Sequence, residues 1–342
     1  MNFILRNAKF GLIILLSAFV FVACDKDDDF NPGGEVNATP NPEPDPDPTD
    51  DGSAETNSIV DFASANGFTS LGAAVEAAGL TATLSGDTEY TVFAPTNDAF
   101  DAFLSDNGFE SLDEVPEDVL TLILMNHVQA GSIMSSDLST GYIQSMAEAG
   151  PDGENLSLYI NVDDGVVING VSTVTSADNE VDNGVVHAVD AVIGLPDVTT
   201  FAMADPSFET LVAALTREDS FTFVETLQST EDPAPFTVFA PTNDAFANLL
   251  AELELSGLAD LDAATLQAAL LYHVVGGANV TSDELTDGME VNTLQEESFT
   301  VNLGDDVVIT DVNERTSTVI AADVQAVNGV IHVIDTVLLP TL

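Results

Sequence analysis

The sequence predicts an α+β fold that is built twice, as two tandem domains. Three blocks recur in the same order: the decapeptide TVFAPTNDAF at Thr91–Phe100 and again at Thr237–Phe246, a His-Val pair, and an NGV block with a histidine near the end of each copy. Apolar residues follow helical spacing in the first half of each copy and alternate with polar residues in the second. Helices followed by antiparallel strands are typical of α+β domains, so we expect domains over 57–196 and 197–342.

An amphipathic helix is expected near the start of each copy. In the second copy, Asp205-Pro206 supplies an N-cap and a first-turn proline. Apolar residues follow at i, i+3, i+4 and i+7 spacing in the second copy, with matching residues in the first. They are Phe208, Leu211, Val212 and Leu215, and in the first copy Phe68, Leu71 and Val75.

The repeated decapeptide combines a strand, a break and a capped helix. The TVF segment favours a strand, and Ala-Pro ends it. Thr96 and Thr242 are the expected N-caps of the next helix. Phe93 and Phe239 belong to the strand, where we expect them in the interior. The decapeptide is therefore predicted to be a structural motif.

The rest of each copy changes from helix to strand. A second helix, expected over 116–125 and 263–271, ends at the His-Val pair. Alternating residues around a Gly/Asp turn predict β-hairpins over 158–170 and 299–310. A β-branched run closes each copy, as at Val330–Leu339. The acidic pairs in the hairpin turns are explained by local hydrogen bonds to the backbone.

The charge balance is extreme. The chain has 58 acidic and 5 basic residues, for a net charge of −53. This sign excludes nucleic-acid binding through a basic surface and disfavours attraction to anionic lipid. Two interpretations stay open: a solvated acidic coat, or weak binding of divalent cations. The acids are not set at ligand spacings, so we predict no defined metal site and no cofactor.

The N-terminal segment predicts export and lipid attachment. Residues 1–23 combine two basic residues with an apolar run that is shorter than a membrane-spanning helix, as in a signal peptide. Ala23-Cys24 resembles the processing site of a bacterial lipoprotein, in which Cys24 is lipidated, although Phe21 replaces the preferred leucine. An ordinary secretory signal followed by a free thiol is the alternative. The acidic residues after Cys24 resemble a surface-export signal, so we expect an outer membrane lipoprotein of the cell envelope, exposed on the surface.

Residues 24–56 form an acidic, proline-rich segment. It consists mainly of Asp, Pro, Asn, Gly and Glu and has few apolar residues. Such a segment cannot bury enough apolar surface to offset chain entropy, so it is predicted to be a disordered stalk. Alternating prolines favour an extended chain, which suits a spacer between a lipid anchor and the two domains.

The three recurring blocks resemble the conserved motifs of the fasciclin domain. TVFAPTNDAF, the histidine pair in NHV and YHV, and NGV-V/I-H with a following Asp-x-Val carry the resemblance, over both copies. It implies that each domain is a wedge-shaped β-sandwich flanked by several helices. It also implies a cell-surface or secreted adhesion module, commonly in tandem, with no catalytic residue in the family pattern.

The four histidines all belong to these motifs. His187 and His332 lie in apolar strand runs, where a hydrogen-bonded structural histidine is expected. The resemblance links the region around Tyr272-His273 to partner binding. The first copy has Asn126-His127 there and lacks the aromatic ring, so the motif supports partner binding less strongly in that copy. No HxH or HExxH spacing indicates a metal site.

Taken together, these features predict a surface-tethered cell-adhesion or matrix-binding module without catalytic activity. No nucleophile or phosphate-binding motif is present, and Cys24 is the one thiol. The expected partners are a cell-surface or extracellular-matrix protein or a glycan, with contact to the membrane through the lipid anchor only and none with nucleic acid. A glycan-binding accessory lipoprotein and a passive acidic surface spacer are the alternatives.

Overall fold

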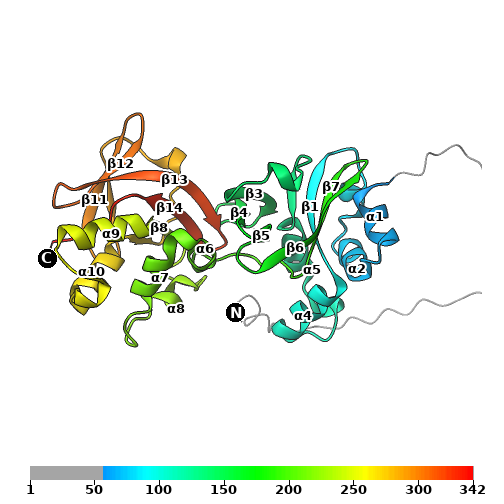
Figure 1. Cartoon of the computed structure of the whole chain (residues 1–342), viewed down its shortest axis with the longest axis horizontal. Helices are drawn as coiled ribbons and strands as arrows, with labels where there is room; N and C mark the ends of the chain where they lie inside the picture. Colours follow the sequence, from blue (N-terminus) through cyan, green and yellow to red (C-terminus); the bar gives the residue numbers. More distant parts are fainter. Residues whose placement is uncertain (1–56, 342) are drawn as a thin grey trace, which may run out of the picture. The chain divides into compact units, whose positions relative to one another are not determined.

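The computed structural model describes residues 57–341. Residues 57–342 belong to one compact unit that contains both sequence copies. We use the name domain 1 for residues 57–196 and domain 2 for residues 197–342 (Figure 1). The signal peptide, Cys24 and the acidic stalk lie outside the described residues.

Domain 1 combines helices, most of them in its first half, with a seven-stranded sheet of order β2-β1-β7-β6-β5-β4-β3. Its elements in chain order are α1 (Ile59–Ala65), α2 (Thr69–Ala77), α3 (Thr81–Leu84), β1 (Tyr90–Pro95), α4 (Asn97–Asn107), η1 (Leu112–Glu114), α5 (Glu117–Met125), β2 (Val128–Ala130), η2 (Ser135–Asp137), β3 (Gly141–Glu148), β4 (Asn155–Asn161), β5 (Val167–Ile168), β6 (Ser172–Val181) and β7 (Gly184–Val189).

Domain 2 repeats this architecture with a sheet of order β10-β11-β12-β13-β14-β8-β9. Its elements are α6 (Val198–Ala204), η3 (Pro206–Phe208), α7 (Glu209–Leu215), α8 (Phe223–Leu227), β8 (Phe236–Pro241), α9 (Asn243–Glu252), η4 (Leu258–Asp260), α10 (Ala263–Tyr272), β9 (Val274–Gly276), η5 (Ser282–Glu284), β10 (Met289–Asn292), β11 (Ser298–Leu303), β12 (Val307–Thr310), β13 (Thr316–Ala326) and β14 (Gly329–Ile334). The predicted α+β class is confirmed for both copies.

The sheets are mixed, and here the expectation of antiparallel strands is wrong in one place. β1 pairs with β7 in parallel, with Phe93 opposite His187, and β8 pairs with β14 in the same way. A parallel pair needs a long connection. The connection is the whole domain, because β1 lies near its start and β7 near its end. The repeated decapeptide thus supplies a strand that is paired on both sides and buried along its full length.

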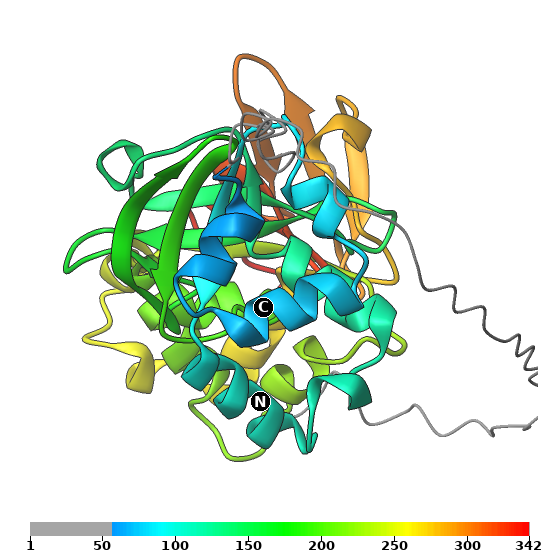
Figure 2. The same cartoon turned by 90° about the vertical axis from the view of Figure 1, so that its right-hand side faces the viewer.

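Each sheet folds over on itself. Register shifts interrupt the pairing of the long strand β6 with β7. The pairing of β13 with β14 has register shifts as well. Such bulges bend and twist a strand. As a result, Phe93 of β1 shares a buried cluster with Leu158 and Ile160 of β4, a strand from the other part of the sheet. Figure 2 shows the blue helices of domain 1 packed beside its green strands. This is the sandwich with flanking helices that the resemblance implies.

Helices α1 and α6 open the domains, ahead of the helix that the sequence periodicity predicts. Both begin at a capping box, on Ser58 and Asp197. A buried asparagine holds each of them to the end of the sheet: the Oδ1 of Asn183 accepts from the Ile59 amide at 2.9 Å, and the Oδ1 of Asn328 accepts from the Val198 amide at 3.0 Å. Seven residues are too few for a clear periodic signal, which is why the sequence pattern misses these helices.

The two domains contact each other through β4 of domain 1 and β13 of domain 2. Every interior residue of β4 is buried, on both faces of the strand. Leu158 faces the core of its own domain, whereas Tyr159 belongs to the apolar cluster of domain 2. The Ser157 hydroxyl accepts a hydrogen bond from the Gln325 amide at 2.9 Å. One face of β4 therefore serves as the docking surface for the second domain.

Candidate functional site

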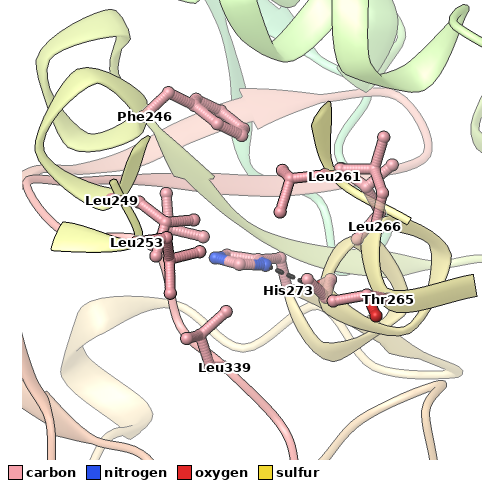
Figure 3. Close-up of a pocket in the computed structure, with 11 residues that line it drawn as sticks. Phe246, Leu249, Leu253, Leu261, Thr265, Leu266, His273 and Leu339 are labelled. Carbon is pink, nitrogen blue, oxygen red and sulfur yellow. Dashed lines mark hydrogen bonds between the residues drawn. The ribbon is translucent and has the colours of Figure 1, made fainter. Parts of the chain in front are cut away.

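The Tyr-His motif of domain 2 lies at the end of α10, and its histidine is a buried structural group. Figure 3 shows the His273 ring surrounded by leucine side chains and Phe246. Its Nδ1 lies 2.7 Å from the carbonyl oxygen of Ala269, and its Nε2 lies 2.9 Å from the amide nitrogen of Leu338. Because the amide must donate, Nε2 accepts and Nδ1 carries the proton. The neutral ring thus ties the helix end to the C-terminal segment of the domain.

His127 makes the same two bonds in domain 1. Its Nδ1 donates to the Ile123 carbonyl at 2.7 Å, and its Nε2 accepts from the Ile193 amide at 2.8 Å. Burial lowers the pKa of both His127 and His273 to about 4, because a charged ring would lose its hydration. Both rings are therefore neutral at physiological pH. Neither nitrogen of either ring is left to bind a metal or a partner.

Tyr272 and Asn126, the residues before these histidines, are both fully buried. The Tyr272 hydroxyl donates to the Ser298 carbonyl at 2.8 Å, and its ring meets Phe299 edge-on at 6.0 Å. Burial raises the pKa of Tyr272 to about 12. Asn126 donates to the Gly194 carbonyl at 2.9 Å, but its Oδ1 has no hydrogen-bond partner among the described residues. Each side chain is therefore part of its own core, and a partner at this motif would touch the surface around it.

The NGV-block histidines lie in β7 and β14, packed against the decapeptide phenylalanines. The ring of His187 is 5.7 Å from that of Phe93, and the ring of His332 is 5.3 Å from that of Phe239. All four side chains are buried. Their Nε2 atoms donate to the carbonyl oxygens of residues 133 and 280, at 3.0 and 2.9 Å. Burial lowers the pKa of His332.

A Ser-Asp-His cluster that the sequence analysis does not identify occurs in both domains. In domain 1 the Asp178 amide donates to Nδ1 of His187 at 3.1 Å, while its carboxylate accepts from the Ser135 amide and hydroxyl at 2.6 and 2.7 Å. These bonds from Ser135 lower the pKa of Asp178. Ser282, Asp323 and His332 repeat the arrangement.

The serine of this cluster bonds the aspartate and not the histidine, so the order of contacts differs from a Ser-His-Asp nucleophile. Both aspartates have a positive φ, 60° for Asp178 and 59° for Asp323, at the bulge of the long strand. The cluster therefore pins the loop after the His-Val pair onto a bent strand. Each aspartate stands nine residues before the histidine of its NGV block, and each serine follows the His-Val pair by a similar interval, a signal that an alignment of the two copies reveals.

The threonines of the decapeptide cap the helices that follow. The Thr96 hydroxyl accepts from the Ala99 amide and the Thr242 hydroxyl from the Ala245 amide, each at 3.3 Å. Thus Phe93, Phe239 and both caps are interior or structural groups, and none of them lines an open cleft.

The space beside His273 is too small for a ligand. It measures about 20 Å³ and is lined by apolar side chains from α9, α10 and the C-terminal segment (Figure 3). A volume of this size admits one water molecule at most, and an apolar lining does not hold it. At the same position in α5, one turn before the histidine, domain 1 has Ile123 where domain 2 has Ala269. The cavity is therefore a packing defect.

A shallow groove of about 80 Å³ lies on the outer side of α10. It is lined by apolar side chains, among them Phe223 of α8, Leu271 and Leu294, and by the polar side chains of two threonines and Gln267. Leu271 and Leu294 are partly exposed. Leu271 directly precedes Tyr272 in the chain, so this groove adjoins the Tyr-His motif.

Chemistry that needs clustered ligands is not indicated by the described residues. Within residues 57–341 no three His, Cys, Asp or Glu side chains are grouped so that they could hold a metal ion. Over the same range, no helix has the length and apolarity required to cross a membrane.

The comparison with protein families decides what these domains are. The model of the fasciclin domain matches residues 66–196 and again residues 206–340. The chain belongs to the fasciclin domain family. The motifs that carried the resemblance are the ones whose histidines, threonines and phenylalanines hold each fasciclin domain together.

Relatives with fasciclin domains come from bacteria and animals. The protein sll1483 of Synechocystis is 41% identical over 174 residues, which are 51% of this chain and 90% of that protein. The pig transforming growth factor-beta-induced protein ig-h3 is 27% identical over 263 residues, and human periostin 29% over 264, each over 75% of this chain. The chain spans only 35% and 29% of those two animal proteins.

Among solved structures, a FAS1 domain pair from the insect cell adhesion molecule fasciclin I is similar. It covers 82% of this chain and 98% of its own, with a TM-score of 0.48 and 22% sequence identity.

Proposed function

We propose that this chain is a surface-tethered adhesion module that binds a cell-surface or extracellular-matrix partner and has no catalytic activity. The observation that supports it best is the presence of two complete fasciclin domains, docked as one compact unit. The motif side chains that could have served catalysis are engaged in internal hydrogen bonds. With the motif side chains engaged inside the domains, we expect the chain to act by binding partners through its exposed surfaces.

The proposed contact surface is the groove beside α10 in domain 2. It combines the partly exposed apolar side chains of Leu271 and Leu294 with polar neighbours, the usual composition of a small protein-binding surface. The α8 wall is a five-residue helix, whereas α3 at the corresponding place in domain 1 has four residues and a different sequence. Domain 2 is therefore the better candidate for binding, as the Tyr-His motif suggests.

An adhesion assay with matched variants tests this proposal. Leu271→Glu places a charge in the groove lining, and Ala264→Glu adds the same charge at an exposed position of the same helix. We expect the full chain with Leu271→Glu to lose at least tenfold in adhesion to cells or matrix-coated surfaces, with and without calcium. Ala264→Glu should bind as the unmodified chain does. Equal adhesion of both variants at unchanged melting temperature would contradict the groove assignment.

The remaining alternatives are outcomes of the same experiment. Binding to a glycan array in place of protein surfaces would favour the glycan-binding accessory lipoprotein. Failure to bind any cell, matrix or glycan surface would favour a passive acidic spacer.

We also propose that Cys24 carries a lipid and that the acidic stalk holds the domains away from an outer membrane. The sequence around Cys24 supports this. Cys24→Ala should move the protein from the membrane fraction to the soluble fraction after cell lysis. Unchanged partition would contradict the anchor.

A further inference from the structure

The face of domain 1 that docks domain 2 is built around two tyrosines. Tyr142 of β3 and Tyr159 of β4 are direct cross-strand partners, with ring centroids 5.1 Å apart. The Tyr142 ring also meets Phe201 of α6 edge-on at 5.8 Å, and its hydroxyl donates to the Asp205 carboxylate. Tyr159 is 2% exposed. An aromatic pair on one domain is thus covered by the first helix of the next.

The same strand positions in domain 2 carry polar residues. The register of β10 and β11 pairs Glu290 with Thr300, as that of β3 and β4 pairs Tyr142 with Tyr159. Glu290 is exposed, and β11 alternates between buried and partly exposed residues, whereas β4 is buried throughout. The copy of the docking face that domain 2 presents outward therefore has a carboxylate where domain 1 has an aromatic ring.

The surface that packs against the β3–β4 face, formed in domain 2 by parts of β13 and α6, also differs between the copies. Gln325 of β13 pairs with Val330 and is 2% exposed at the domain contact. Glu180 of β6 pairs with Val185 at the equivalent place and is exposed. Phe62 of α1 occupies the position of Phe201 and is only partly buried, since no neighbouring domain covers it among the described residues.

We infer that the β3–β4 face is a docking surface used once, inside the chain, and that Glu180, Glu290 and Thr300 prevent a second copy from docking end to end. A second molecule could otherwise repeat the internal contact, since a heterologous interface continues into a filament unless something stops it. In that geometry Glu290 would be buried near Phe62, in a domain that contains no lysine or arginine. A buried carboxylate without a cation is strongly unfavourable.

The block to association lies at the contact itself and not in the overall charge. The net charge of −53 repels copies at long range, and salt screens that repulsion. A desolvated carboxylate at the contact is screened much less. The chain should therefore remain monomeric at high salt, whereas general repulsion alone would allow assembly once it is screened.

The test is the mass of the full chain, purified in detergent and measured by light scattering over a range of protein and salt concentrations. In a variant with Glu180→Gln, Glu290→Tyr and Thr300→Tyr, the free surfaces of both domains carry the residue types found at the internal contact, namely Gln325, Tyr142 and Tyr159. We expect its mass to rise with concentration at high salt, to dimers and longer species, with an association constant at least tenfold above that of the unmodified chain.

A control variant separates this effect from loss of charge or added aromatic surface. Glu110→Gln, Asp305→Tyr and Asp306→Tyr add the same two tyrosines and remove three carboxylates, one more than the test variant, at other exposed positions. This variant should stay monomeric. A triple variant that associates no more than the control overturns the inference. So does an unmodified chain that assembles at high salt and loses this assembly on Phe62→Asp.

Discussion

The Tyr142 hydroxyl of domain 1 donates a 2.9 Å hydrogen bond to the Asp205 carboxylate of domain 2, across the contact between the domains. The second oxygen of Asp205 accepts from the Ser207 amide, so the same side chain caps the 3₁₀ turn that begins at Pro206. Burial, followed by the negative charge of Asp205, raises the pKa of Tyr142. Domain docking and the local fold of domain 2 therefore share one carboxylate.

Removing this hydroxyl should weaken the docking of the domains. Tyr142→Phe keeps the ring contacts and loses a hydrogen bond to a charged group, for an expected cost of about 1.5 to 3 kcal/mol. Urea unfolding of the full chain measures it. Combining Tyr142→Phe with Asp205→Ala should give less than the sum of the two single effects, because both changes remove the same bond. Additive effects would show that the two side chains do not interact.

Phe239 should be essential for the stability of domain 2. It is 1% exposed, meets Phe299 edge-on at 4.9 Å and packs against the His332 ring at 5.3 Å. Phe239→Ala should cost about 3–5 kcal/mol, because the surrounding strands cannot close the cavity. Phe93→Ala tests the same role in domain 1. Unchanged thermal unfolding in either variant would show that its phenylalanine is not a core residue.

His127 and His273 should make the protein less stable in mild acid. Their pKa of about 4 in the folded state lies below the ordinary 6.5. The unfolded chain therefore binds more protons as the pH falls. The stabilisation is fully present above pH 6.5 and is lost as the pH falls toward 4, by on the order of 3 kcal/mol for each histidine.

The pH effect is isolated by comparing the chain with a His127→Gln, His273→Gln variant. Urea unfolding at pH 7 and pH 5 should show a smaller loss of stability in the variant, because glutamine does not titrate. Carboxylates contribute equally to both proteins and cancel in the comparison. An identical loss in both proteins would argue against neutral buried histidines.

The cavity beside His273 predicts opposite effects of two substitutions. Ala269→Val should fill part of it and stabilise domain 2 by about 0.5–2 kcal/mol. Ile123→Ala should create the same defect in domain 1 and cost about 2–5 kcal/mol. Thermal unfolding measures both. Destabilisation by Ala269→Val would mean that the neighbouring leucines leave no usable space.

Local features of the fold could be predicted from the sequence, whereas long-range pairing could not. The strand, break and cap of the decapeptide follow from adjacent residues, and the structure has them at β1, α4, β8 and α9. The parallel pairing of β1 with β7 joins residues almost a whole domain apart, and no spacing pattern encodes it. The helices α1 and α6 are short, and their packing depends on distant asparagines.

The candidate site shows the same division. The sequence identified Tyr272 and His273 as a motif, but burial depends on what covers them. The Ser-Asp-His clusters combine residues from a loop and two strands, so they emerge only once the strands are paired. Likewise, the contact of Tyr142 with Asp205 depends on how two folded domains meet.

The order of the strands has a consequence for how the chain folds during synthesis. In each domain the last strand, β7 or β14, lies between the first strand and the bulged strand, near the centre of the sheet. During synthesis or export, the first strand, β1 or β8, therefore stays unpaired with β7 or β14 until the whole domain has emerged. Such non-local pairing is slow and leaves a hydrophobic strand open to wrong partners. Chaperone dependence should be set by this interval, and the dense negative charge of the nascent chain would keep neighbouring molecules apart while it lasts.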